Sequence, residues 1–388
     1  MFWNLFKKEL KYIFKNITFY IFIIVVGLFY FTQFSPPSTT KNFKPIAPSG
    51  LNDKERMLGY GSKDITDPKK EIREMYMNLY RDYESGSIYK EKLMLNVTVK
   101  LDEDEKQYIK DAMESIAPDE YLNNKDEKLI KVSYEQYLNI MEDLDKKLGG
   151  STYYGEKRRH TVLNEPKTYE DALKDYKELL EKDKLTNAEG RVFADYMGIT
   201  AGFFPVFLAA FILIKDKRSK MQELICSRSV SAYTYILSKY TALCTAVLIP
   251  YFMFAAYSTF IFYRIGNFNN YNIDMLAFFK YTIWWVAPTV LFTAAVGMLI
   301  SVIFNNGIIA IPIQFILWIS SLTPLSGNYS LSKFIIRFNT FGDYLNYIKW
   351  SETIAINRVF YIAASSILAL IASLVWSKKR GAIGEYIK

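Results

Sequence analysis

The chain contains very little cysteine and histidine. Its 388 residues include two cysteines, Cys226 and Cys244, and one histidine, His160. Neither cysteine lies in residues 35–190, so that stretch folds without a disulfide and must rest on packing alone. Cys226 lies in a basic stretch and Cys244 in an apolar run, so we expect no metal or redox pair between them. His160 follows three basic residues, a setting typical of an exposed side chain, so we expect no Ser/His/Asp triad.

Motifs that would give the chain an energy source or a catalytic centre of its own are also missing. There is no GxxxxGK[ST] loop for ATP phosphates and no HExxH helix for zinc. The apolar runs hold few ionisable residues, and Asp195 and Lys239 lie near the ends of theirs. A proton- or sodium-driven carrier normally has charges at mid-membrane, and no inverted repeat is visible. We therefore expect a partner to supply the energy, and a membrane enzyme is the least favoured class.

The composition indicates a lipid-soluble part joined to a water-soluble part. Hydrophobic residues make up 51% and aromatic residues 16%, yet 23% are charged and the mean hydropathy is +0.01. Residues 35–190 hold 27 Lys+Arg against 32 Asp+Glu, a net charge of −5, so the remainder carries +13 to give the net +8 of the chain. The basic excess belongs to the apolar part, and it does not indicate nucleic-acid binding.

The first 34 residues combine an amphipathic segment with the first apolar run. Residues 1–16 place lysines on one side and Phe, Trp and Leu on the other at helical spacing, which predicts an interfacial helix. Residues 17–34 are long enough to cross a bilayer. They lack a small-x-small cleavage site and end in QFSPPS, so we interpret them as an uncleaved signal anchor and not as a signal peptide. Four lysines before this run predict a cytoplasmic N-terminus.

Residues 35–190 are expected to form an extracellular domain. A linker rich in Pro, Ser and Thr opens it. Residues 93–100 alternate apolar and polar side chains, which indicates a half-buried strand. The many tyrosines fit either a core or a binding groove, and their helical spacing favours the core. Helix-start signals stand at Asp67-Pro68, Asp102, Ser133 with Gln136, and Thr168 with Asp171.

Five further apolar runs lie in residues 191–376. The predicted second to sixth spans are residues 191–214, 242–263, 276–304, 308–322 and 354–376. Thr186 with Glu189 is expected to cap the helix of the second span. Residues 324–353 mix polar and apolar positions, which predicts short helices lying on the outer leaflet or re-entering it, with Lys333 and Arg337 snorkelling to water.

The predicted fold class is a membrane all-α protein with six transmembrane helices. A large, mostly helical (α+β) extracellular domain is inserted between the first and second spans. Basic residues at the N-terminus, in the loop 215–235 and in the tail 377–388 place all three in the cytoplasm. The expected localisation is therefore a cell membrane, with multiple passes and both termini cytoplasmic.

The short basic loop, residues 215–235, lies between the second and third spans. It holds Asp216, Arg218 and Glu223-Leu224, and Lys239 follows. In these residues, in the amphipathic start, in the large loop after the first span and in the short helices expected before the last, the chain resembles the permease subunits of ABC-2 type transporters. It departs from their pattern at two positions, Lys220 where glycine is usual and Ser229 where proline is usual.

The resemblance implies a six-span exporter subunit, typically bacterial, that is served by a separate ATPase. The loop would be the coupling helix that fits a groove on the ATPase, and ATP and magnesium would bind that partner and not this chain. Two ATPase copies and a second permease, identical or related, would complete the assembly within the membrane lipid. The coupling residues would be Arg218, Met221, Glu223, Leu224, Ile225 and Arg228. The pathway would pass near the second and fifth spans, where Pro205 and Pro312 could kink the helices and Gln314 could line the path.

Other interpretations remain open from the residues themselves. The charges of the loop could serve only as an orientation signal. The whole chain could be a membrane-anchored extracellular binding or sensory protein without transport activity. The large outer domain favours a peptide, a lipid or a drug-like amphiphile as substrate over a simple ion. A neighbouring reading frame with GxxxxGK[ST] would favour the exporter.

Overall fold

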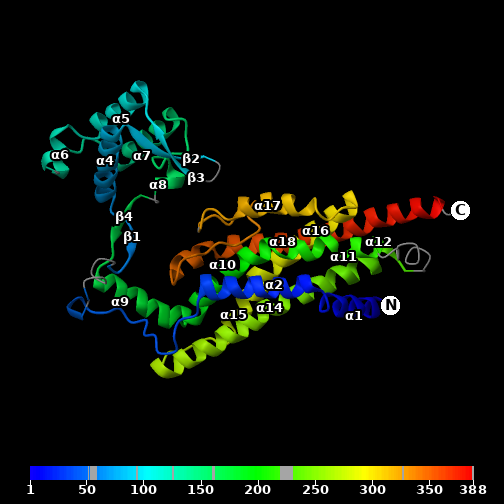
Figure 1. Cartoon of the computed structure of the whole chain (residues 1–388). Coiled ribbons are helices and arrows are strands. Elements are labelled where there is room, and N and C mark those ends of the chain that lie inside the picture. The colour runs from blue at the N-terminus through cyan, green and yellow to red at the C-terminus, as the bar shows by residue number, and fades with distance from the viewer. Residues whose placement is uncertain are drawn as a thin grey trace. The chain divides into compact units, whose positions relative to one another are not determined.

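The chain folds into two compact units in a computed structural model (Figure 1). The structure describes residues 1–388 except 51, 53–58, 93–94, 125, 160–161, 219–229, 326 and 387–388. The helical unit comprises Met1–Phe43 and Asp175–Lys388, and the small unit comprises Lys44–Lys174. The small unit is thus shorter than the predicted 35–190, because residues 35–43 and 175–190 belong to the helical unit. Phe43, for example, stacks on Phe341 and meets Tyr271 edge-on.

The small unit is mostly helical with two short antiparallel strand pairs. Strand β2 pairs with β3 in a hairpin, and β1 pairs with β4. A hydrophobic core that includes the fully buried Tyr76 and Tyr137 lies between α4, α5 and α7, which confirms the core interpretation for these two tyrosines. The elements are β1 Ser62–Asp64, α4 Pro68–Ser85, β2 Ser87–Lys92, β3 Leu95–Lys100, α5 Glu103–Ile116, α6 Glu120–Asn124, α7 Tyr134–Lys147, α8 Glu156–Arg159 and β4 Asn164–Pro166.

The helix-start signals that the sequence predicts at Asp67, Ser133 and Thr168 are formed as hydrogen-bonded caps. The Asp67 side chain accepts the Lys69 amide, and Ser133 with Gln136 forms a full capping box at α7. Thr168 and Asp171 bond reciprocally at the start of α9 (Tyr169–Glu178). The sequence did not reveal β1, β2 or β4, because a strand of three residues or a strand rich in Lys carries little periodic signal.

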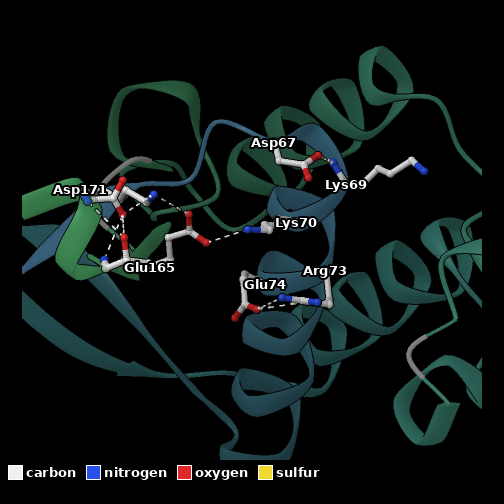
Figure 2. A network of polar contacts seen from close by, with 9 residues as sticks. Asp67, Lys69, Lys70, Arg73, Glu74, Glu165 and Asp171 are labelled. Carbon is white, nitrogen blue, oxygen red and sulfur yellow. Dashed lines mark hydrogen bonds and ion pairs between the residues drawn. The ribbon is translucent and has the colours of Figure 1, made fainter. Parts of the chain in front are cut away.

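A charge network joins β1, β4 and the helices α4 and α9. Lys63 Nζ lies 2.7 Å from Asp171 Oδ2 and 3.6 Å from Glu165 Oε1, and Lys70 Nζ lies 3.0 Å from the other oxygen of Glu165. Figure 2 shows Glu165 reaching toward Lys70 with Asp171 beyond it. Lys63 and Glu165 are also cross-strand partners, so these side chains fasten a strand pair that is only three residues long.

This network predicts an acid-labile strand pair. The hydrogen bond from Lys63 lowers the pKa of Asp171 from 3.8 to about 2. A carboxyl whose pKa is depressed by folding stabilises the fold above pH 3.8, and that contribution is lost as the pH falls toward 2. We expect the amide-exchange protection of β1, corrected for the intrinsic rate, to fall over this window in the full-length protein. Lys63→Met should reduce the pH dependence, because only the hydrogen bonds from Thr168 then lower the pKa of Asp171. Constant protection in the native protein would contradict the prediction.

The helical unit is built from long apolar helices that run side by side (Figure 1). Among the described residues, five helices are long and apolar enough to cross a membrane. They are Ile17–Phe34, Thr186–Asp216, Ala232–Asn269, Ala277–Phe304 and Tyr344–Arg380. The first span consists of α2 (Ile17–Phe29) and a π-helical turn, Tyr30–Phe34, and the second consists of α10 (Thr186–Phe203), α11 (Pro205–Ile212) and α12 (Ile214–Arg218). The third is α14 (Ala232–Asn269), and the fourth consists of α15 (Ala277–Tyr281), a π-helical turn and α16 (Ala287–Phe304). The last span belongs to α18 (Tyr344–Tyr386).

The predicted fifth span is shorter than expected. Residues 308–322 form α17 (Ala310–Ser321), which has 12 residues. At 1.5 Å per residue it is about 18 Å long, less than the ~30 Å core of a bilayer. By length alone, the helices therefore support five spans and leave the crossing by α17 open.

Two predictions about the helical unit are wrong. Thr186 and Glu189 do not cap α10, because its N-cap is Leu185 and no side chain caps the first turn. The Thr186 hydroxyl instead accepts the Asp274 amide. Residues 327–343 contain no helix, and α18 already begins at Tyr344. Side chains of neighbouring elements bond several backbone groups of this segment in place of helical hydrogen bonds.

Candidate functional site

Most of the predicted coupling residues fall on a segment that the structure does not describe. Met221, Glu223, Leu224, Ile225 and Arg228 lie outside the described residues. Arg218 is the last residue of α12. The described part of this region consists of the two helix ends that flank the segment, α12 before it and the start of α14 after it.

Five side chains form an ion cluster between these helix ends and the N-terminal helix α1 (Phe2–Ile13). Glu9 of α1 holds Lys215 at 2.8 Å through one carboxylate oxygen and Lys239 at 2.6 Å through the other. Lys239 Nζ also lies 3.0 Å from Asp216 Oδ2, and the Tyr235 hydroxyl donates to the same Asp216 oxygen. We call Glu9, Lys215, Asp216, Tyr235 and Lys239 the stem cluster.

The stem cluster is desolvated and balanced in charge. The Lys239 side chain is 1% exposed, and the two carboxylates are each 14% exposed. Two cations face two anions, and each cation contacts at least one carboxylate. A buried charge is costly unless it is paired and hydrogen-bonded. The arrangement therefore holds α1, α12 and α14 in one relative position.

The apolar face of α1 explains how Glu9 reaches this site. Leu5, Phe6 and Leu10 pack against the core of the helical unit, and Ile13 is buried in it. Glu9 follows Phe6 by three residues and precedes Ile13 by four, so it lies on the same side of the helix. The sequence predicted the amphipathic helix, but its apolar face is covered by α14 of the same chain.

Residues from α16 and α18 extend the connections at this end of the unit. Tyr235 stacks on Trp376 with ring centroids 4.6 Å apart. Arg380 donates to the carbonyl of Val230, the residue that precedes the start of α14 by two. Lys379 Nζ donates to the carbonyls of Val302 and Ile303 at 2.6 and 2.8 Å, near the end of α16. The contacts around the two flanks of the undescribed segment thus connect α1, α12, α14 and α18, and α18 is connected in turn to α16.

Two of the three predicted pathway residues, Pro205 and Gln314, meet at a break in the second span. Helix α10 ends at Phe203 and α11 begins at Pro205, so the helix is interrupted there as expected for proline. Gln314 is fully buried, and its amide donates to the Gly202 carbonyl at 2.6 Å. Pro312 lies in the first turn of α17, where a missing amide hydrogen removes no helical bond, and the helix is unbroken. Gln314 therefore ties α17 to the break, and within this chain it is not exposed.

Sequence reasoning missed a set of buried charges around residues 327–343. Arg337 was expected to reach water, but it is 7% exposed and donates from Nε and Nη2 to the two oxygens of Asp195 at 2.9 and 3.2 Å. The Phe338 amide bonds the same carboxylate at 2.6 Å. Lys333 is also buried and donates to the Ser320 carbonyl. The signal that could have revealed this is the lack of helical periodicity beside membrane spans, where an irregular backbone must be satisfied by protein.

The segment is held from α18 as well. Asn357 Nδ2 donates to the carbonyls of Tyr329, Ser330 and Lys333. Arg358 is fully buried, and its guanidinium donates to the Phe334 carbonyl and to Asn357, Trp285 and Thr289. These adjacent side chains give the non-helical backbone the hydrogen bonds that lipid cannot supply.

The comparison with protein families assigns the chain to a class. A family model described as ABC-2 family transporter protein matches residues 11–375. The chain belongs to this family and is a multi-pass membrane permease of an ABC transporter, a class that works with an ABC ATPase. Neither the search of curated proteins nor the search of solved structures gave a match.

Proposed function

We propose that the chain is the membrane-spanning subunit of an ABC exporter that works as a permease pair with two copies of a separate ATPase. The observation that supports this most is the stem cluster, which locks both flanks of the predicted coupling loop 215–235 to α1. ATP-driven closure of the ATPases would push this loop, and the cluster would pass the push to α12, α14 and α18. ATP and magnesium would bind the ATPase, so the chain itself would have no enzymatic role.

The contacts at the stem cluster also support six crossings with both termini in the cytoplasm. Glu9, near the N-terminus, pairs with Lys239, and Arg380, near the C-terminus, bonds Val230. Both ends of the chain therefore meet the start of α14, and the N and C labels lie at one end of the helical unit in Figure 1. Termini on one side require an even number of crossings. The 12-residue α17, continued by the buried segment 327–343, would make the fifth crossing, and α18 would make the sixth.

The small unit would then lie outside the cell. It is inserted between the first span and α10. It follows the end of the first span that is opposite to α1, and it precedes the end of the second span that is opposite to the loop. Its size favours a peptide, lipid or drug-like amphiphile as the exported substrate. The competing proposal is a membrane-anchored binding or sensory protein, for which an unchanged phenotype after loss of the ATPase gene would be the expected result.

The coupling assignment is tested with Glu223→Ala in the loop. We expect ATP-stimulated efflux from reconstituted vesicles to fall at least about tenfold, because a charged contact at an interface is worth about 1.5–3 kcal/mol. ATPase co-purification should weaken in parallel. The matched control is Glu352→Ala, which removes an exposed carboxylate from α18. If efflux and co-purification are both unchanged in Glu223→Ala, the loop is an orientation signal only.

A further inference from the structure

The outward side of α1 carries only cationic, amide and aromatic side chains. Lys7, Lys8 and Lys11 are all exposed, and on a helix of 3.6 residues per turn they lie within about 100° of one another. Trp3, which is 67% exposed, borders this side. Among the described residues, no ion pair or hydrogen bond engages the three lysine side chains.

The single acidic residue of α1, Glu9, does not lie on this surface. Glu9 is turned toward α14, where Lys215 and Lys239 take both of its oxygens. Glu9 is one or two residues from Lys7, Lys8 and Lys11, a spacing at which helical side chains do not face each other, so it does not neutralise them. The stem cluster thus leaves a continuous cationic surface, made of Lys7, Lys8 and Lys11, on a helix whose opposite side is buried.

The position of α1 next to the first span indicates which ligands this cationic surface can contact. Helix α1 ends at Ile13, and α2, the first apolar span, begins at Ile17 with Asn16 as its cap. Three residues cannot carry α1 more than about 10 Å from the start of the span. The C-terminal end of α1, which carries Lys11, therefore lies close to the depth of the lipid headgroups, where lysine can meet phosphate.

We propose that α1 is a binding surface for anionic phospholipid headgroups, formed by Lys7, Lys8 and Lys11 with Trp3 at its border. The attraction is electrostatic, so it selects headgroups that carry a net negative charge over zwitterionic ones. The proposal depends on the membrane location of the family and not on the exported substrate. It gives the permease a dependence on lipid composition at the helix that is locked to the loop.

The test uses the full chain in vesicles and reads lipid contact at Trp3. Brominated phosphatidylglycerol or brominated phosphatidylcholine is added at a few mole per cent to phosphatidylcholine vesicles. The Trp3 signal is the quenching difference between the native chain and Trp3→Phe. We expect phosphatidylglycerol to quench Trp3 at a lower mole fraction than phosphatidylcholine, with the difference reduced at high salt. In Lys7→Gln/Lys8→Gln/Lys11→Gln the phosphatidylglycerol fraction for half-quenching should rise at least about fivefold, the factor for loss of one lysine at an anionic surface.

A matched control separates this surface from net charge. Lys110→Gln/Lys146→Gln/Lys174→Gln removes three exposed lysines from the small unit and should leave the Trp3 quenching unchanged. Equal quenching by the two lipids in the native chain, or an equal loss in the control, would overturn the proposal. A third result would also overturn it: unchanged lipid preference in the α1 triple variant with weaker ATPase binding in detergent, which would make the surface a docking site for protein.

Discussion

Asp195→Ala is expected to lower the free energy of unfolding of the helical unit by about 3–5 kcal/mol, because it leaves a buried guanidinium without its counter-charge. Arg337 is 7% exposed and Asp195 is fully buried. The substitution also removes the acceptor of the Phe338 amide, and an unsatisfied buried amide adds to the cost. Since these bonds attach the segment 327–343 to α10, we expect that segment to exchange its amide hydrogens faster than the rest of the unit.

The measurement is reversible unfolding in mixed micelles, combined with a double-mutant cycle. Asp195→Ala/Arg337→Leu removes both charges and should recover at least half of the loss, because no unpaired charge remains. Additive single effects would contradict a direct interaction. A change below about 1 kcal/mol in Asp195→Ala would show that Arg337 finds water or another anion, and the buried ion pair would then be wrong.

Glu9→Gln is expected to separate transport from ATPase binding. The amide keeps the size of the side chain but removes the charge that compensates Lys215 and Lys239. Asp216 alone then faces two cations, of which Lys239 is 1% exposed. A hydrogen bond to a charged group contributes about 1.5–3 kcal/mol, so a corresponding weakening of the contact between α1 and α14 should follow. We expect ATP-stimulated efflux to fall at least about tenfold while the ATPase still co-purifies.

The loop itself is unchanged in Glu9→Gln, and this is why binding should survive. Glu352→Gln serves as the control, since it neutralises an exposed carboxylate of α18. Lys239→Met should reproduce the Glu9→Gln result from the other partner of the contact. Efflux equal to that of the native chain in both variants would show that the stem cluster is structural only, and the coupling route through α1 would be wrong.

Several parts of the fold follow from local sequence. The capping boxes at Asp102 and Ser133 act over three residues, so their sequence signature is also their structure. The break at Pro205 is equally local, because proline removes an amide and clashes with the preceding turn. The apolar runs also predicted the long helices. A run of that length is stable in lipid, where only a helix satisfies the backbone hydrogen bonds within the segment.

The prediction failed where a side chain depends on a distant partner. Arg337 and Asp195 are 142 residues apart, and the sequence offered no reason to join them. Arg337, in a segment of mixed polar and apolar residues, was therefore predicted to be exposed to solvent. The length of α17 was likewise overestimated. Composition does not show that side chains from other elements will hydrogen-bond the backbone that follows this helix, so that it need not be helical.

What the sequence by itself determined is the class: apolar runs, a basic loop with the family pattern, and a separate small unit. Each of these rests on hydration or on contacts within a few residues. Only the tertiary structure decided that Glu9 joins both flanks of the loop, across 206 and 230 residues, and that residues 327–343 are buried without a helix. The physical reason is desolvation, because a charge or a free carbonyl removed from water must be paired, and packing alone determines which partner is near.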